Sequence, residues 1–533
     1  MKRIFTLFVV VSAMSSFAQA PAIQWQKSYG GTYTDIATVI RQTTDGGYIV
    51  AGSTNSDDVD VTGLNGGASN AGTGNSDMWV IRLNASGGFK WGKCLGGGWI
   101  DGATDVRQTT DGGFAVAGWG NCGVCPYAYY LYKLDSSGSL LWYKSYGGNT
   151  YEEAASMQQT KDGGFILAGT SSSTNGQVTG HHGDSTTTDY WVVKTDTAGN
   201  IQWQKSYGGS LNETAASVSQ TKDGGYIISG YSQSDDGDVT GHHGTPCSFT
   251  GYCNDIWIVK IDSTGTIQWQ KSLGGTDEDE AADVHQTADG GYIVAGSVKS
   301  DDGDVTGTHP GPVIATFDYW LVKLDGSGTL QWEKTFGGTF DEVAHSVQQT
   351  TDGGYIIAGK ARSLNGDVTG IYGGSDYWIV KTDSVGKLQW EKCYGGTSED
   401  EAFCVQQTTD RGYVIAGSTF SPVGDDITRS LGGADFWIVK TVSANSGIAD
   451  VSSVNNFHIY PNPAEADLFV SDFELQGGEV MITDIFGRRL IVKTLMTNNY
   501  KTTIDISGLM TGIYLVILKG NDGRSAFEKL IKE

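Results

Sequence analysis

Hydrophobic and polar residues alternate in short runs along this chain of 533 residues, and the runs recur in groups of four. In one group they cover residues 344–350, 355–359, 377–381 and 388–392. Each run is rich in β-branched and aromatic residues and is bounded by Gly, Asp and Ser, a pattern typical of short β-strands. No long helical periodicity interrupts residues 24–440. The sequence therefore predicts an all-β protein.

The group of four runs is a repeat, with copies 51 to 66 residues apart. A Trp in the fourth run marks each copy, at Trp25, Trp91, Trp142, Trp203, Trp269, Trp332 and Trp390. Asp-Gly-Gly between the first two runs predicts a tight hairpin, because Gly adopts positive φ without a steric penalty. Seven units of four strands predict a seven-bladed β-propeller, with the repeated Trp residues in its core.

The two ends of the repeat region indicate how the ring closes. The region begins with a lone fourth run at residues 23–28, and its last unit stops after a third run at residues 436–440. We expect the N-terminal strand to complete the last unit, because that pairing satisfies two otherwise open sheet edges. An open solenoid is the alternative, and it would leave the first strand without a sheet.

The chain divides into four predicted segments. Residues 1–20 read as a secretory signal, with cleavage after Ala18 or Ala20. Residues 21–441 form the propeller, residues 442–456 a polar linker, and residues 457–533 a second domain of alternating strands. No later stretch is long and apolar enough for a transmembrane helix.

The formal net charge of −25 lies mostly in the propeller region. We expect no nucleic-acid partner, because phosphates require a basic footprint. A cation, a basic partner or plain solubility fits this charge better.

The C-terminal domain carries a combination of specific motifs. Tyr460-Pro461-Asn462-Pro463 stands near its start, Asp484-Ile485-Phe486-Gly487-Arg488 in its middle, and Ser507-Gly508-Leu509 precedes Gly512-Ile513-Tyr514. It resembles the type A C-terminal sorting domain of the type IX secretion system of Bacteroidetes. The resemblance implies a small immunoglobulin-like β-sandwich that the secretion machinery recognises after periplasmic transit. It implies that the cargo is then released or attached at the cell surface. The repeats themselves resemble uncharacterised Bacteroidetes propellers with Asp-Gly-Gly-Tyr units.

Two sets of acids are candidate sites on the loop-bearing face. One acid follows the Gly-Gly of each unit and is predicted to ring the channel mouth: Asp35, Asp101, Glu152, Glu213, Asp279, Glu342 and Asp400. These acids either make a repeated structural bond or hold a cation. Asp-rich turns contribute a second set, with calcium or simple turn chemistry as the two interpretations: Asp236, Asp238, Asp302 and Asp304. Calcium is the one cofactor that the sequence suggests.

Two further features concern cysteines and the second unit. Cys247 and Cys253 share one loop and are expected to pair, while Cys122 and Cys125 form either a disulfide that closes their loop, free thiols or a redox pair.

The second unit departs from the repeat and is rich in aromatic residues. These suit sugar rings or a protein partner, or they extend the core: Trp99, Trp119, Tyr127 and Tyr129.

These features favour an exported, non-enzymatic binding or scaffold protein that is secreted or displayed on the outer membrane. An enzyme usually breaks a repeat with unique acid, base or nucleophile residues, whereas these acids recur seven times. A glycan lyase or hydrolase on the propeller scaffold, or a structural surface component, are the alternatives. The expected partners are the type IX machinery, through residues 457–533, and a glycan or protein ligand on the acidic loop face.

Overall fold

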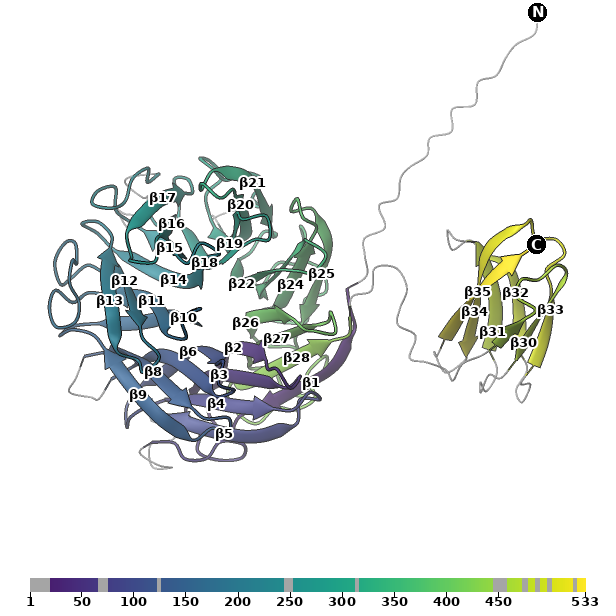
Figure 1. The fold of residues 1–533 in the computed structure, drawn as a ribbon, viewed down its shortest axis with the longest axis horizontal. Coiled ribbons are helices and arrows are strands. Elements are labelled where there is room, and N and C mark those ends of the chain that lie inside the picture. The colour runs from purple at the N-terminus through teal and green to yellow at the C-terminus, as the bar shows by residue number, and fades with distance from the viewer. Residues whose placement is uncertain are drawn as a thin grey trace, which may run out of the picture. The chain divides into compact units, whose positions relative to one another are not determined.

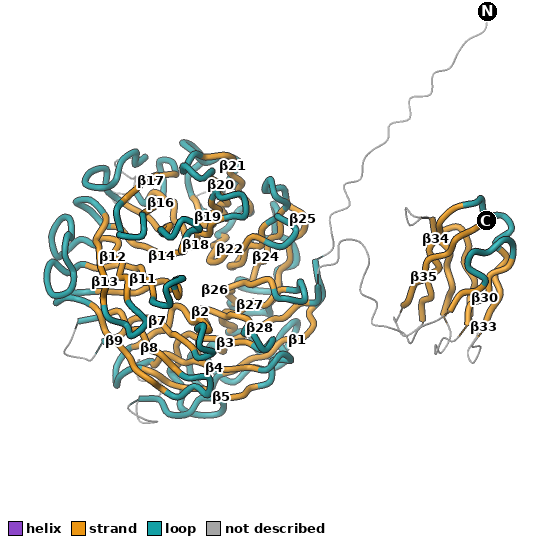
Figure 2. The backbone as a smooth tube through the Cα atoms, in the orientation of Figure 1, coloured by secondary structure: helices purple, strands orange, loops and turns teal. Residues whose placement is uncertain are grey.

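The computed structural model describes residues 20–65, 75–121, 126–243, 253–311, 316–443, 458–471, 478–484, 489–495, 501–520 and 525–533. The chain divides into two compact units, residues 1–444 and 445–533. Nearly all of the predicted signal peptide and nearly all of the predicted linker lie outside the described residues. Every helix or strand assigned in the described ranges is a strand (Figure 2), and none of these residues forms a helix able to cross a membrane.

The strands of the larger unit fall into four repeated sets. The first strands are β2 (Asp35–Gln42), β6 (Asp101–Gln108), β10 (Glu152–Gln159), β14 (Glu213–Gln220), β18 (Asp279–Gln286), β22 (Glu342–Gln349) and β26 (Asp400–Gln407). The second strands are β3 (Tyr48–Thr54), β7 (Phe114–Gly120), β11 (Phe165–Ser171), β15 (Tyr226–Ser232), β19 (Tyr292–Val298), β23 (Tyr355–Ala361) and β27 (Tyr413–Thr419). The third strands are β4 (Asp77–Leu83), β8 (Ala128–Leu134), β12 (Asp189–Thr195), β16 (Asp255–Ile261), β20 (Asp318–Leu324), β24 (Asp376–Thr382) and β28 (Asp435–Thr441). The fourth strands are β5 (Phe89–Leu95), β9 (Leu140–Tyr146), β13 (Ile201–Tyr207), β17 (Ile267–Leu273), β21 (Leu330–Phe336), β25 (Leu388–Tyr394) and β1 (Ile23–Tyr29).

These strands form seven four-stranded antiparallel sheets, each ordered from first to fourth strand. Figure 1 shows the sheets arranged in a ring in chain order, with the purple β1 beside the green β28. The arrangement fits a β-propeller. The strands extend one or two residues beyond several of the predicted bounds, because the flanking residues also pair across the sheet.

The seventh sheet is completed by the N-terminal strand, as the repeat pattern predicts. β1 pairs antiparallel with β28, from Ile23 opposite Thr441 to Tyr29 opposite Phe436. The indole Nε1 of Trp437 donates to Gln26 at 2.9 Å, so a side-chain bond reinforces the ladder.

The ring is closed by a second set of bonds around its centre. Each first strand contacts the first strands of both neighbouring units, β26 and β2 included. A Gln ends every first strand, and its side-chain oxygen accepts a backbone N–H from the hairpin of the preceding unit at 2.7–3.0 Å. The bond from Thr409 N–H to Gln42 joins the last unit to the first. The seven bonds therefore form a closed ring.

Aromatic residues fill the space between sheets. The third-strand Trp residues are almost fully buried: Trp79, Trp191, Trp257, Trp320, Trp378 and Trp437. Each fourth-strand Trp packs against the Tyr or Phe that opens the second strand of the next unit, with ring centroids 5.5–6.3 Å apart. Edge-on aromatic packing of this kind adds to the stability from buried area. The prediction of a Trp core is confirmed for the third-strand residues, whereas the fourth-strand Trp residues other than Trp390 are partly buried and pack against that core.

The smaller unit consists of two sheets around one core. Its strands are β29 (His458–Tyr460), β30 (Asp467–Ser471), β31 (Gly478–Asp484), β32 (Arg489–Leu495), β33 (Lys501–Asp505), β34 (Gly512–Gly520) and β35 (Ser525–Lys532). The sheets have the orders β29-β30-β33 and β32-β31-β34-β35. Leu468, Ile482 and Val516 are among the buried residues that both sheets contribute to the core.

Candidate functional site

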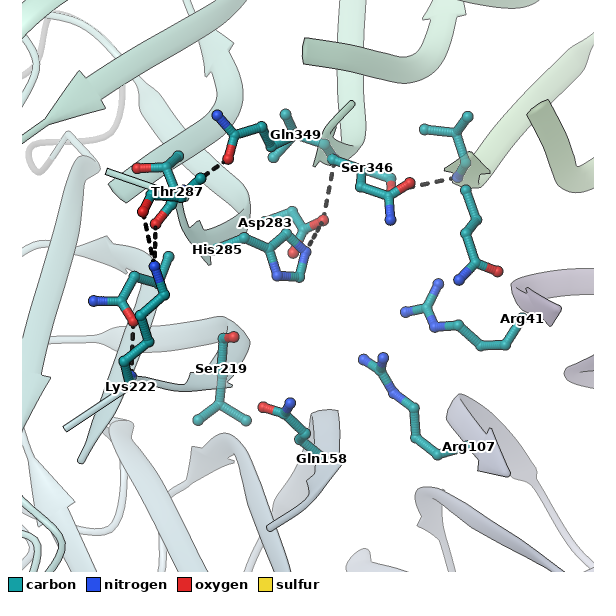
Figure 3. A pocket seen from close by; sticks show the side chains of 17 residues that line it. Arg41, Arg107, Gln158, Ser219, Lys222, Asp283, His285, Thr287, Ser346 and Gln349 are labelled. Atoms are coloured by element: carbon teal, nitrogen blue, oxygen red, sulfur yellow. Dashed lines mark hydrogen bonds and ion pairs between the residues drawn. The ribbon is translucent and has the colours of Figure 1, made fainter. Parts of the chain in front are cut away.

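A cavity of ≈ 430 Å³ lies where the seven first strands converge (Figure 3). Every first strand contributes to its lining, through Arg41, Arg107, Gln158, Ser219, His285, Gln348 and Gln406. Lys222 and Thr287 also line it, so it reaches the hairpins between first and second strands. A smaller cavity of ≈ 90 Å³ shares Arg41 and Arg107 with it. Small-ligand sites typically measure about 300–1,000 Å³. A cavity of ≈ 370 Å³ beside Trp91 and Phe114 also falls in this range. The central cavity is the candidate site because all seven units contribute to its lining.

Two arginines from neighbouring units reach into this cavity from one side (Figure 3). Both lie near the carboxylate of Asp105, with Arg107 Nη2 at 3.1 Å from Oδ2 and Arg41 Nη2 at 3.8 Å from Oδ1. Burial lowers the pKa of Arg107, and repulsion by the charge of Arg41 lowers it further. Within the described residues, the Nε of each arginine has no hydrogen-bond partner. Two cations thus share one buried carboxylate and retain unused donors.

A His–Asp pair belongs to the same cavity. The Nε2 of His285 lies 3.2 Å from Oδ2 of Asp283. The same carboxylate accepts the hydroxyl of Ser217 at 2.8 Å and the backbone N–H of Val347 at 3.0 Å. Burial acts to raise the pKa of Asp283, but His285 and these bonds outweigh it and lower the pKa to about 2. Asp283 therefore stays ionised and orients the imidazole ring.

These cavity residues share one position of the repeat, directly before the Gln that ends the first strand. Three units have Gln there, and its side-chain oxygen accepts a backbone N–H of the next unit at 2.6–2.7 Å. The other four units have Arg41, Arg107, Ser219 and His285. Departures from the repeat were expected in the second unit and in the loops, so this position was not among the predicted site residues. The available signal was two arginines at one repeat position of a strongly acidic chain.

The seven acids predicted to ring the channel mouth are buried at the starts of the first strands. All seven are at most 1% exposed: Asp35, Asp101, Glu152, Glu213, Asp279, Glu342 and Asp400. Each accepts the backbone N–H of the Gly four residues before it, at 2.7–2.9 Å. The acids predicted to ring the channel mouth are thus buried, and their carboxylates anchor the loops that connect consecutive units. The contacts agree with the structural one of the two interpretations.

A second buried acid faces six of these seven. It begins the third strand of the preceding unit, as Asp77, Asp189, Asp255, Asp318, Asp376 and Asp435. A Cβ added to Gly30 would lie 2.5 Å from an oxygen of Asp35 and 2.6 Å from one of Asp435, so the two carboxyl groups of that pair meet at one glycine. Within the described chain, the Oδ1 of each third-strand acid has no hydrogen-bond partner. Burial first, and the neighbouring acid after it, raises the pKa of Asp435 to about 7. One proton per pair therefore suffices to relieve the repulsion.

The Asp-rich turns also hold loops in place. The residues predicted as calcium ligands were Asp236, Asp238, Asp302 and Asp304. Asp302 accepts the backbone N–H of Thr276 at 2.8 Å, and Asn365 accepts that of Thr339 at 3.0 Å in the equivalent place. The bond therefore requires an acceptor but no charge. No group of three or more His, Cys, Asp or Glu in the described residues is arranged to hold a metal ion.

We expect Asp302→Asn to leave the melting temperature of the full chain almost unchanged, in excess calcium and in excess chelator alike. Asp302→Ala should cost about 0.5–1.5 kcal/mol, the net contribution of an exposed hydrogen bond whose acceptor is replaced by water. Thermal melts of the three proteins test this. A calcium-dependent rise in melting temperature that the Asn variant loses would instead assign a cation to the turn.

The aromatic residues of the second unit divide into exposed and buried ones. Trp99 is 52% exposed, and Trp119 and Tyr127 are half-buried with ring centroids 5.6 Å apart. Tyr129 is fully buried, and its hydroxyl donates to the backbone carbonyl of Trp191 in the next unit at 3.0 Å. Tyr129 is therefore part of the contact between units, which corrects its assignment as a ligand-binding residue.

The cysteine predictions concern residues that are mostly outside the described ranges. Cys122, Cys125 and Cys247 lie outside them. Cys253 is buried and disulfide-bonded. The free cysteines of the described chain lie on repeat strands: Cys94, Cys393 and Cys404.

Comparison with known proteins gives a family for the smaller unit. Residues 458–533 match the family described as "Secretion system C-terminal sorting domain". The regulatory protein FlaEY of Caulobacter vibrioides is 24% identical over 299 residues, which are 55% of this chain and 30% of that protein. The chain thus spans less than a third of the length of this curated relative.

Solved structures with a similar fold have little sequence in common with the chain. The Pan2 WD40 domain of Neurospora crassa is 11% identical, with a TM-score of 0.42 over 77% of this chain and 89% of that one. Puromycin hydrolase is also 11% identical, with a TM-score of 0.43 over 92% of this chain and 59% of that one. The family match shows that residues 458–533 are a C-terminal sorting domain of the type IX secretion system, and the chain is an exported protein whose larger unit has a β-propeller fold.

Proposed function

We propose that this protein is a secreted or surface-displayed binding protein that holds its ligand in the cavity at the centre of the ring. The seven sheets act as the seven blades of a closed propeller. The cavity carries this proposal, because it has the volume of a small-ligand site. It is also where four units replace the repeated Gln by a different residue: Arg41, Arg107, Ser219 and His285. The sequence favours a ligand on the loop-bearing face instead, where the exposed Trp99 remains a surface candidate.

The C-terminal unit is proposed to act as the signal that directs the protein to the type IX secretion machinery. Its two sheets around one core are consistent with an immunoglobulin-like sandwich. The secretion machinery would recognise it after periplasmic transit, and the propeller would then be released or attached at the cell surface. Residues 458–533 would take no part in ligand binding.

A non-enzymatic role is the main proposal, because the repeated acids are buried and engaged in structural bonds. One observation favours the alternative of a glycan-active enzyme. His285 and Asp283 form an oriented pair at the same cavity as the two arginines, and such a pair can support acid–base catalysis. Product formation from a bound oligosaccharide would decide for the enzyme.

We expect Ser219→Trp to abolish ligand binding, because the indole fills the cavity where Ser219 lines it. Ser219→Gln is the matched control, since three other units carry Gln at this position. Both variants and the parent are screened against neutral and acidic saccharides by the shift in melting temperature. If a ligand of the parent protein also binds the Trp variant with unchanged affinity, its site lies elsewhere and the proposal fails.

A further inference from the structure

We propose that Arg41 and Arg107 form an anion-binding site in the central cavity, which takes the carboxylate, sulfate or phosphate group of a ligand. This inference rests on the proposed function and names the chemistry of the ligand. Its starting point is an imbalance of charge. The chain has 60 acids and 35 Lys and Arg residues. Yet the larger cavity is lined by Arg41, Arg107 and Lys222 against the single carboxylate of Asp283.

The two arginines are held where an anion can meet both. They come from equivalent positions of neighbouring first strands, β2 and β6, and are directed into the same space (Figure 3). Asp105, on β6, is only 5% exposed and lies between them, at 3.1 Å from Arg107 and 3.8 Å from Arg41. The charge of Asp283 also acts on Arg41, so two carboxylates, Asp105 and Asp283, face Arg41, Arg107 and the Lys222 that lines the same cavity. Two carboxylates cannot neutralise three cations, so one positive charge is left over. An arriving oxyanion would balance it.

The remaining donors fit such a group. A guanidinium has five N–H donors in a planar fork, which matches the oxygens of carboxylate and phosphate groups. Arg41 uses Nη1 on Cys404 and on the carbonyl of Ile40, and Arg107 uses Nη2 on Asp105. The Nε of both is buried and has no partner within the described residues. Charge-assisted bonds formed in a partly enclosed cavity are also stronger than the same bonds in bulk water.

The repeat argues against a purely structural role for the two arginines. Gln158, Gln348 and Gln406 occupy the same position in other units, and each accepts a backbone N–H of its neighbour. A neutral side chain is therefore sufficient to join the strands there. The arginines place charge where the scaffold requires only a hydrogen-bond acceptor.

The test uses the full chain and three probes: inorganic sulfate, inorganic phosphate and glucuronate. Binding is measured by titration calorimetry and by the shift in melting temperature. Each probe replaces chloride in the buffer so that the ionic strength stays constant, and glucose is the neutral control. Arg41→Gln and Arg107→Gln introduce the residue that the repeat itself uses, so both should fold. Arg362→Gln removes the same charge from an exposed side chain paired with Glu399, and it is the matched control.

We expect at least one probe to bind the parent protein and to raise its melting temperature. Each cavity variant should weaken that binding about tenfold or more, and Arg362→Gln should leave it unchanged. The anion whose affinity falls most identifies the group recognised. Absence of binding by all three probes overturns the inference, as does unchanged affinity in both cavity variants.

The outcome also separates this inference from the proposed function. A neutral saccharide could bind the parent protein, lose its binding in the Ser219→Trp variant and keep its affinity in both cavity arginine variants. That result would support the central binding site and refute the inference of an anion-binding site. Binding of every ligand to the Ser219→Trp protein would refute the central site itself.

Discussion

Removal of residues 20–29 is expected to abolish folding of the larger unit. The deletion takes away β1 and leaves β28 as an open edge. It removes Trp25, which packs on Tyr48 of the first sheet, and Tyr29, which is 5% exposed and bonds to the carbonyl of Gly87. Loss of a large aromatic side chain from a core costs about 3–5 kcal/mol, and each lost backbone hydrogen bond about 1 kcal/mol.

The sum of these losses is comparable with the whole stability of a typical domain, about 5–15 kcal/mol. The measurement is a thermal melt followed by Trp fluorescence, comparing residues 20–533 with residues 30–533. Tryptophan reports on the larger unit alone, because all fifteen Trp residues precede residue 444.

A circular permutant provides the control. It places residues 20–29 after Thr441, joined by Asp-Ser-Val-Gly-Lys, the segment that links β24 to β25 in the chain itself. This permutant should recover the melting temperature of the parent. A truncated protein that melts like the parent would mean that β1 does not close the ring.

Stability is expected to fall by several kcal/mol as pH rises from about 5 to about 8. The cause is the set of six buried carboxyl pairs between units. Burial is the largest of the causes that raise the pKa of one acid in four of these pairs to about 7: Asp77, Asp279, Asp376 and Asp435. A raised pKa means that the folded state binds protons more tightly than the unfolded chain does.

The stability linked to these protons is complete below the unfolded pKa near 4, and it is lost as pH rises through about 7. With one pKa unit equal to about 1.4 kcal/mol, and one proton shared by each pair, we expect a loss of about 1–2 kcal/mol of stability for each pair.

The opposite trend begins at lower pH. A hydrogen bond from Thr109, which outweighs burial, lowers the pKa of Asp111 to about 2, so its stabilisation is lost as pH falls from about 4 through 2. The maximum should therefore lie between about pH 4 and pH 5.

Urea unfolding of the full chain at both pH values, followed by Trp fluorescence, measures this difference. Asp435→Asn is the informative variant, because the amide keeps the shape and cannot ionise. It should lose less stability than the parent between the two pH values. Equal stability of the parent at pH 5 and pH 8 would show that the pairs are not protonated in the folded protein.

Much of this architecture could be predicted because its causes are local and are repeated. Alternation, Asp-Gly-Gly hairpins and the lone strand at residues 23–28 predicted the strands, the turns and the pairing of β1 with β28. The hairpin of the seventh unit has Arg411 in place of the Gly, with φ of 66°, so the turn survives even this substitution. The sorting domain was recognised from motifs such as Tyr460-Pro461-Asn462-Pro463, which are contiguous in sequence.

The candidate site depended on contacts that no local pattern contains. The acid of each first strand looked like a channel lining, yet Asp279 is buried and bonded to the N–H of Gly275. The side on which a repeated residue lies depends on how consecutive sheets pack. Likewise, Arg41 and Arg107 are 66 residues apart and meet only because the first strands converge at the centre of the ring. The sequence by itself thus determined the repeating unit, its closure and its export address. Only the tertiary structure decided which repeated charges are buried and which two arginines share a cavity, because both follow from the packing of whole units around one axis.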